Sequence, residues 1–167
     1  MAARGARTIR AGFTLVELVM VLAIIAVVAA IAAPRWGRSM ARWHADAAAR
    51  RLCADLAWAQ SRARITSSSQ TLQINPSTGQ YQLLGVADPD HPAAVYTVSL
   101  GQSPYASTVS SPGWSGGPLN VVFDGYGNPA GSTTLVIQSG DFQRTVTVNP
   151  GANSTGGAGI AGSVSLQ

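Results

Sequence analysis

The sequence predicts an α+β fold in which one long N-terminal helix packs on a small antiparallel β-sheet or sandwich. Residues 13–33 form an apolar run in which Glu17 is the single charge. Apolar residues then recur at spacings of three and four as far as residue 63, which is the period of an amphipathic helix. Short stretches of alternating polarity follow from residue 71, separated by turn residues. The length of 167 residues suits one small domain with an appendage.

The charges divide the chain into two different halves. All 11 basic residues are arginines, and every one except Arg144 lies before residue 65. The later part carries four aspartates and is rich in Gly, Ser, Thr and Asn, so it is mildly acidic. The single cysteine, Cys53, excludes a disulfide within the chain.

The apolar run from Phe13 to Ala33 is long enough to cross a membrane. As a helix it extends about 30 Å, the thickness of the hydrocarbon core. The basic leader, residues 1–12, favours a cytoplasmic location for this end and a location outside the cytoplasm for the rest. Three arginines also follow the run, at Arg35, Arg38 and Arg42. They reduce the difference in positive charge between the two flanks, so charge alone does not determine the orientation.

Two simpler interpretations of this run stay open. It could be a secretory signal that is cut near Ala32, or a plain membrane anchor with Glu17 among the headgroups. Against a signal are the length of the run, the carboxylate at its start and Pro34 beside the expected cut. Neither interpretation explains the particular order of the residues.

The order Gly12-Phe13-Thr14-Leu15-Val16-Glu17 resembles the prepilin peptidase site of type IV pilins and type II secretion pseudopilins. The resemblance implies a cut between Gly12 and Phe13, so that residues 1–12 are a leader peptide, and N-methylation of the new N-terminal Phe13. Pro34 falls where many pilins also carry a proline. Ala11 departs from the family pattern, which more often has Lys or Arg before the glycine.

Glu17 has a physical reason to be in the apolar run. A carboxylate at membrane depth costs about 2.5 to 3.5 kcal/mol on insertion scales and usually faces a partner. The resemblance implies that this partner is the N-terminal amine of an incoming subunit, so that the glutamate promotes assembly. The partial positive charge of a helix N-terminus lowers the cost before assembly.

The predicted helix runs from Phe13 to Arg64, or about 78 Å. Residues 13–35 form its transmembrane half and residues 36–66 its amphipathic half, which we expect to pack on the sheet. Pro34 removes one backbone hydrogen bond, so a kink is expected there. One apolar stripe is predicted along the second half, with the charged residues, Asp46 and Asp55 included, on the other faces. The stripe comprises Trp36, Met40, Trp43, Ala47, Ala48, Leu52, Leu56, Ala59 and Ala63.

Residues 67–150 are predicted to form a β-rich globular domain. A hairpin is expected around residues 75–79, between strands at 71–74 and 81–84. Residues 101–118 are interpreted as a long surface loop, and the Gly- and Ser-rich residues 151–167 as a flexible tail. Four further strands are predicted at 95–100, 119–123, 133–138 and 142–148.

Residues 55–150, which include the stretch from Val121 to Pro129, resemble the H-type minor pseudopilins and the FimT-like minor pilins. The first resemblance implies a subunit of a short periplasmic filament that pushes folded proteins outward, and the second implies DNA capture during uptake. Phosphate neutralisation supplies much of the affinity for DNA and needs several exposed Lys or Arg. Arg144 is the single basic residue of the predicted β-rich domain. DNA binding is therefore the less favoured alternative.

Nothing in the sequence points to catalysis. It contains no serine elbow, phosphate loop or cluster with metal-ligand spacing, so neither a cofactor nor a metal is expected. Asp88 and Asp90 fall short of the six to eight oxygens that calcium needs. The sequence therefore predicts a structural filament subunit in the inner membrane, with its C-terminal domain outside the cytoplasm. Its expected partners are other pilin or pseudopilin subunits, the prepilin peptidase and the inner-membrane assembly platform. A membrane-tethered domain that never assembles is the remaining alternative.

Overall fold

The computed structural model describes residues 12–150 and 160–163, and confirms the α+β class. Helix α1 spans Leu15–Thr66. The strands are β1 (Gln70–Asn75), β2 (Gln80–Ala87), β3 (Val95–Ser99), β4 (Thr108–Ser110), β5 (Leu119–Phe123), β6 (Thr133–Ser139), β7 (Phe142–Val148) and β8 (Ile160–Ser163). The chain divides into two compact units, Met1–Gly37 and Arg38–Gln167, which are described separately below.

The described part of the first unit is the N-terminal part of α1. The helix begins at Leu15, two residues after the predicted start, and its assignment runs through Pro34 without a break. Side chains from 15 to 31 are exposed. Among the described residues, α1 is the one helix long and apolar enough to cross a membrane, and its most apolar 18-residue stretch has a mean hydropathy of 3.0. The kink expected at Pro34 stays a prediction.

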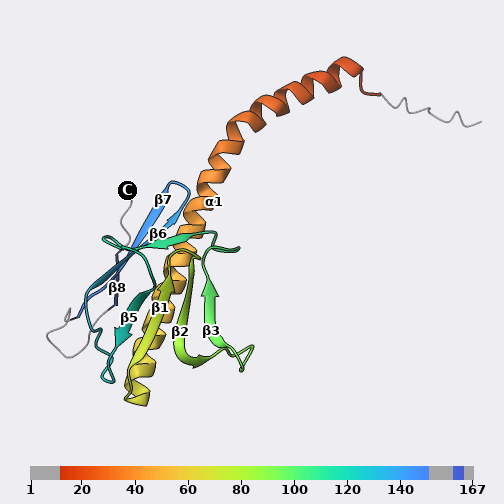
Figure 1. The fold of residues 1–167 in the computed structure, drawn as a ribbon. Helices are drawn as coiled ribbons and strands as arrows, with labels where there is room; N and C mark the ends of the chain where they lie inside the picture. Colours follow the sequence, from red (N-terminus) through yellow and green to blue (C-terminus); the bar gives the residue numbers. More distant parts are fainter. Residues whose placement is uncertain (1–11, 151–159, 164–167) are drawn as a thin grey trace, which may run out of the picture. The chain divides into compact units, whose positions relative to one another are not determined.

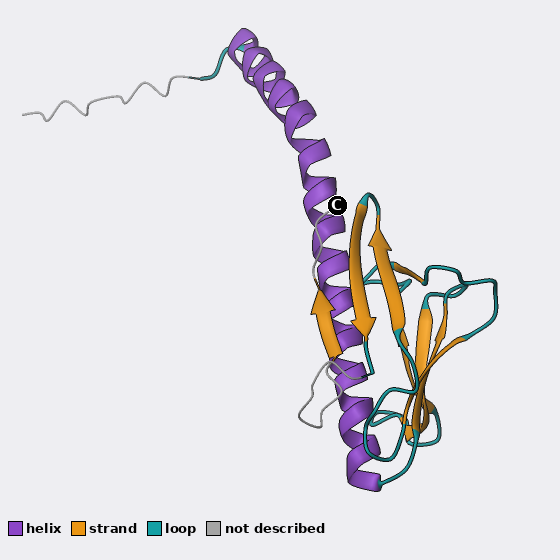
Figure 2. Ribbon diagram, turned by 90° about the vertical axis from the view of Figure 1, so that its left-hand side faces the viewer, coloured by secondary structure: helices purple, strands orange, loops and turns teal. Residues whose placement is uncertain are grey.

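The second unit contains two antiparallel four-stranded sheets (Figures 1 and 2). The strand order of the first, sheet A, is β3-β2-β1-β5, and that of the second, sheet B, is β4-β6-β7-β8. The predicted hairpin is present as β1 and β2, with Asn75 opposite Gln80. Gly79 closes its turn at a φ of 64°, a conformation that favours glycine.

Two strands, β4 and β8, lie in segments that were predicted to be a surface loop and a flexible tail, so these two predictions were wrong in part. β4 lies within the expected surface loop and pairs with β6, and only Val109 among its residues turns into the core. A strand with one apolar residue has no alternation to detect. β8 lies within the expected flexible tail and pairs with β7, with Ile160 opposite Val148. The rest of that tail lies outside the described residues.

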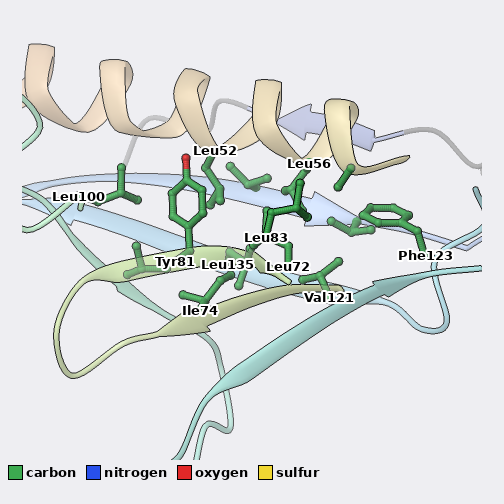
Figure 3. Packing of buried hydrophobic residues seen from close by; sticks show 14 of the residues in the cluster. Leu52, Leu56, Leu72, Ile74, Tyr81, Leu83, Leu100, Val121, Phe123 and Leu135 are labelled. Carbon is green, nitrogen blue, oxygen red and sulfur yellow. The ribbon is translucent and has the colours of Figure 1, made fainter. Parts of the chain in front are cut away.

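The core lies between α1 and the inward faces of both sheets. Leu52 and Leu56 point from α1 toward the strands, and the Tyr81 hydroxyl points back toward the helix (Figure 3). The fully buried residues of α1 are Ala45, Ala48, Leu52, Leu56, Ala59 and Ala63. The second half of the predicted stripe is therefore buried as expected.

The first half of the predicted stripe does not face the core. Trp36, Met40 and Trp43 are 73%, 44% and 65% exposed. Trp43 and Leu52 are nine residues apart in sequence, or about 2.5 helical turns, which places them on opposite faces of α1. The stripe was thus two apolar faces that follow one another along the helix, and only the second packs on the sheets.

Candidate assembly site

The predicted cleavage and assembly residues lie at the start of α1. Gly12 and Phe13 precede the helix, and the Phe13 side chain is 81% exposed. The Glu17 amide donates a hydrogen bond to Thr14 Oγ1 at 3.2 Å, so Thr14 caps the helix. The spacing Thr-x-x-Glu is that of a capping box, a local signal that the sequence analysis did not use.

Glu17 is exposed, in the first turn of α1. Within the described residues its carboxylate accepts no hydrogen bond and forms no ion pair. The unpaired N–H groups of the first helical turn give this end a partial positive charge, which favours an acidic residue there. The arrangement leaves the carboxylate available to a group from outside the chain.

The expected leader lies mostly outside the described residues, which begin at Gly12. The cut after Gly12, the methylation of Phe13 and the pairing of Glu17 concern other molecules, so each stays a prediction. Pro34 lies within the helix assignment, and its side chain is not described.

A buried polar cluster joins α1 to sheet A. Asp55 is 7% exposed, although the sequence pattern placed it on a polar face of the helix. Its Oδ2 accepts hydrogen bonds from Tyr81 Oη at 2.5 Å, from Tyr96 Oη at 3.0 Å and from Arg51 Nε at 3.2 Å. Arg51 also donates through Nη2 to the Tyr96 hydroxyl. The cluster satisfies a carboxylate that would otherwise be costly to bury.

Both tyrosines of this cluster are held in their neutral form. Burial raises the pKa of Tyr81 above its usual value, and the hydrogen bond to Asp55 raises it further. Burial also raises the pKa of Tyr96, followed by the charge of Asp55. Because both hydroxyls donate to a carboxylate, loss of either proton would place two negative charges side by side.

An ion pair between a buried arginine and a half-buried aspartate joins α1 to sheet B. Arg144 lies at an inward position of β7 and is 2% exposed. Its Nε donates to Asp46 Oδ1 at 2.5 Å, and its Nη1 donates to the Gln143 carbonyl at 3.0 Å. The single basic residue of the β-rich domain is therefore buried and not open to a ligand. This guanidinium holds the helix to the sheet.

The glycine-rich loop after β5 is organised by Asp124. Asp124 Oδ1 accepts hydrogen bonds from the amides of Tyr126 at 2.9 Å and Asn128 at 2.7 Å. The backbone bond from Asn128 is the main reason that the pKa of Asp124 is lowered. This is the stretch in which the resemblance to minor pilins was noted.

The same loop is bound to the C-terminal end of α1. Gln60 Nε2 donates to the Gly127 carbonyl at 2.8 Å, and Arg64 Nε donates to the Tyr126 carbonyl at 3.2 Å. The loop therefore fixes the helix end. Among the described residues, no group of three or more His, Cys, Asp or Glu is placed to hold a metal ion.

One long helix packed on two antiparallel sheets defines a pilin-like protein. The fold matches the crystal structure of the type IV minor pilin FimU from Pseudomonas aeruginosa, with a TM-score of 0.53 and 19% identity over 75% of this chain and 94% of that chain. A second crystal form of FimU matches with a TM-score of 0.46 and 18% identity, over 62% of this chain and 85% of that chain. At this identity the likeness shows the fold alone.

The family model of the type II transport protein GspH matches residues 48–152. The prokaryotic N-terminal methylation motif matches residues 7–33. No match was found among curated proteins. The chain belongs to the GspH family, within the superfamily of type IV pilins and type II secretion pseudopilins, which confirms the resemblance noted in the sequence.

Proposed function

We propose that the protein is a minor pseudopilin of a type II secretion filament, processed by prepilin peptidase and assembled through its N-terminal helix. The observation that carries the proposal is the pairing of the two family matches on one chain: the GspH domain follows a methylation motif. The protein is a structural subunit in this proposal, and its partners are other pseudopilins, the peptidase, the inner-membrane assembly platform and the membrane itself.

Processing takes place between Gly12 and Phe13 in this proposal. Residues 12–14 have no regular secondary structure, and α1 begins at Leu15, so the peptide bond lies outside the helical hydrogen-bond ladder. A peptidase needs such an accessible backbone. Mass spectrometry of the chain purified from its own cells tests this step. A mass matching N-methylated Phe13 is expected, whereas an intact Met1 or a start near Pro34 would overturn it.

Assembly depends on Glu17 in this proposal. Its carboxylate, which has no partner in the described residues, pairs with the Phe13 amine of the adjacent subunit. A Glu17→Ala variant is expected to be cleaved normally but to lose most of its co-purification with partner pseudopilins. Glu17→Asp, which keeps the charge, is the matched control and should retain more of it. Normal co-purification of Glu17→Ala would contradict the proposal.

The apolar part of α1 serves as membrane anchor before assembly and as filament core afterwards. The precursor then lies in the inner membrane with its C-terminal domain outside the cytoplasm, and the mature subunit lies in a periplasmic or surface filament. The unpaired Glu17 charge and the length of the apolar run support this order of events.

DNA capture is the less supported alternative. Arg144 is buried and paired with Asp46, so the exposed arginines of the second unit lie on α1 and not on the sheets. A mobility shift of duplex DNA by the full chain at moderate salt would favour DNA capture over secretion. A chain that keeps its leader and stays alone beside a full set of partners would instead be a tethered domain that never assembles.

A further inference from the structure

The outward face of sheet A is entirely uncharged. Its four strands contain no Asp, Glu, Lys or Arg, on either face. Their apolar side chains mostly turn inward to the core, whereas amides and hydroxyls dominate the outward positions. Charged residues are the usual means of keeping a sheet surface soluble. The outward polar residues are Thr71, Gln73, Asn75, Gln80, Gln82, Thr97, Ser99 and Asn120.

One row of these residues crosses the whole sheet. Thr97 is opposite Gln82, Gln82 is opposite Gln73, and Gln73 is opposite Asn120. Gln82 Nε2 donates to Gln73 Oε1 at 2.8 Å, and Gln73 Nε2 donates to Asn120 Oδ1 at 3.1 Å. We call Gln82, Gln73 and Asn120 the amide row. Its hydrogen bonds fix which end of each amide faces which neighbour.

The fixed orientation leaves defined groups open at both ends of the amide row. Gln82 Oε1 is an acceptor and Asn120 Nδ2 a donor, and neither has a hydrogen-bond partner among the described residues. The whole Gln80 amide is likewise without one. Ser99, which is opposite Gln80 on β3, has a buried hydroxyl oxygen that has no partner. A buried polar atom without a partner is uncommon in folded proteins.

A hollow lies over Gln73 and Gln82 of the amide row. It has a volume of about 270 Å³, and Gln73, Gln82, Gln80 and Thr97 line it together with Asn75, Thr78, Tyr81 and Pro118. All of these residues are uncharged. In ligand-binding sites, a few placed polar groups that donate and accept hydrogen bonds fix the orientation of the ligand.

We propose that this hollow binds a neutral, hydroxyl-rich ligand, namely a short segment of a glycan. A sugar hydroxyl donates one hydrogen bond and accepts others, and an amide side chain supplies both an acceptor and donors. The oriented amide row presents these groups at intervals set by the strand spacing, about 4.8 Å. An amide row therefore suits successive hydroxyls along a sugar chain.

The same chemistry disfavours other ligands. An anion or a cation bound in the hollow would lose water without gaining an opposite charge, which is unfavourable. The centres of protein interfaces are enriched in aromatic side chains, Met and Arg, whereas this hollow is lined mostly by amides and hydroxyls. A neutral glycan is the class that uses the groups present.

The test is a titration of the full chain with defined sugars. The protein is held in dodecylphosphocholine micelles, because a sugar-based detergent would compete. Cellotetraose, maltotetraose and the tetramer of N-acetylglucosamine are the neutral probes, and trigalacturonate is the charged probe. Saturation-transfer NMR is expected to show saturable binding of at least one neutral probe, with a Kd of about 1 mM or tighter, and none of trigalacturonate.

Two variants locate the binding. Gln73→Leu removes the middle of the amide row and is expected to weaken binding at least tenfold. Gln80→Ala removes an amide that holds nothing else in place and should weaken binding as well, without disturbing the fold. Gln143→Leu is the matched control, since Gln143 forms a cross-strand amide pair with Gln138 on sheet B. It should leave the Kd within twofold of that of the unchanged chain.

Four results would overturn the inference. The first is that no neutral probe saturates the protein at 10 mM, and the second is that trigalacturonate binds equally well. The third is that Gln143→Leu loses as much binding as the two variants in the hollow. The fourth is that Gln73→Leu or Gln80→Ala changes self-association in light scattering but leaves sugar binding unchanged. The last would assign the hollow to contacts between subunits. None of these measurements depends on cleavage or on Glu17, so the outcome is independent of the proposed secretion role.

Discussion

The Asp55 carboxylate shows how single residues hold this protein together. Three donors, two from sheet A and one from α1, converge on one of its oxygens. Hydrogen bonds to a charged group contribute more than neutral ones, and a buried donor left without an acceptor is costly. The cluster should therefore contribute stability beyond that of the apolar contacts around it.

Replacement of Asp55 by alanine is expected to lower the free energy of unfolding by about 2 to 3 kcal/mol, because it leaves the Tyr81 and Tyr96 hydroxyls without their acceptor. Asp141→Ala, at an exposed position, is the matched control and should change it by less than about 0.5 kcal/mol. Urea unfolding of the full chain in micelles measures both. Equal effects of the two substitutions would show that the cluster is energetically neutral.

Alkaline pH should destabilise the protein through the same cluster. The pKa values of Tyr81 and Tyr96 are raised in the folded state, so the unfolded chain loses these protons first as the pH rises above 10. Stability is then lost by up to about 1.4 kcal/mol per pH unit for each tyrosine. Tyr81→Phe removes one of the two, so its stability should fall less steeply between pH 10 and 11.5. Identical slopes for the unchanged chain and Tyr81→Phe would show that folding does not raise the pKa of Tyr81.

Loss of Asp46 should destabilise the protein more than loss of its partner Arg144. Asp46→Ala leaves a fully buried guanidinium without its counter-charge, which costs about 3 kcal/mol or more. Arg144→Met removes the buried charge and leaves a carboxylate whose side chain is 30% exposed, so the expected loss is about 1 kcal/mol. Unfolding of both single variants and the double variant measures the difference. A larger loss for Arg144→Met would contradict this account.

At the scale of elements, periodicity was a reliable guide where an element carried enough apolar residues to show it. All six predicted strands are present, and α1 ends within two residues of its predicted end. β4 and β8 were missed because their partners, and not their own residues, place them in a sheet. Trp43 was assigned to the core because a spacing of three or four fits more than one face of a long helix.

The candidate site was predictable to a different degree. Gly12, Phe13 and Glu17 form a local motif, so they can be proposed from the sequence alone, and their roles stay predictions. Arg51 lies four residues from Asp55, but the two tyrosine partners of Asp55 lie 26 and 41 residues away, and Arg144 lies 98 residues from Asp46. From sequence periodicity alone, a charged side chain is predicted to be exposed to solvent. Only the tertiary fold shows that a residue distant in sequence pairs with it and allows it to be buried.

The loop after β5 gives a prediction at the scale of elements. A Cβ at Gly125 would lie 2.8 Å from the backbone carbonyl carbon and oxygen of Ser67, just past the end of α1. Gly125→Ala must therefore displace the loop from the helix end, with an expected loss of about 1 to 3 kcal/mol in stability. Gly131→Ala is the control, since nothing lies within 4 Å of its Cβ. A destabilisation of equal size in both would refute the close approach.

At the scale of the whole molecule, helix α1 belongs to two units that have different surroundings. Apart from Thr14 and Glu17, the described side chains of the first are apolar and exposed, which suits lipid or a filament core. The second has its own core and two buried polar clusters, as a domain in water requires. Membership of the GspH family fits this division, because its matched region covers most of the second unit.

This division predicts that assembly and folding can be separated by mutation. Glu17 is exposed and bonds within its own helical turn through its amide, so Glu17→Gln removes a charge without removing that hydrogen bond. The unfolding midpoint of the second unit should stay within about 1 °C of that of the unchanged chain, because a surface substitution rarely alters stability measurably. Incorporation into the filament should nevertheless fall sharply, since a neutral amide offers the incoming amine no counter-charge.

Asp46→Ala provides the opposite case. It removes the counter-charge of the buried Arg144 guanidinium and leaves Glu17 intact. Its unfolding midpoint should therefore fall, whereas the fraction that remains folded at low temperature should still be incorporated. Thermal unfolding and co-purification of both variants, measured on the same preparations, distinguish the two effects. A lowered midpoint in Glu17→Gln would mean that this carboxylate supports the fold of the subunit, and its loss from filaments would then reveal nothing about pairing between subunits.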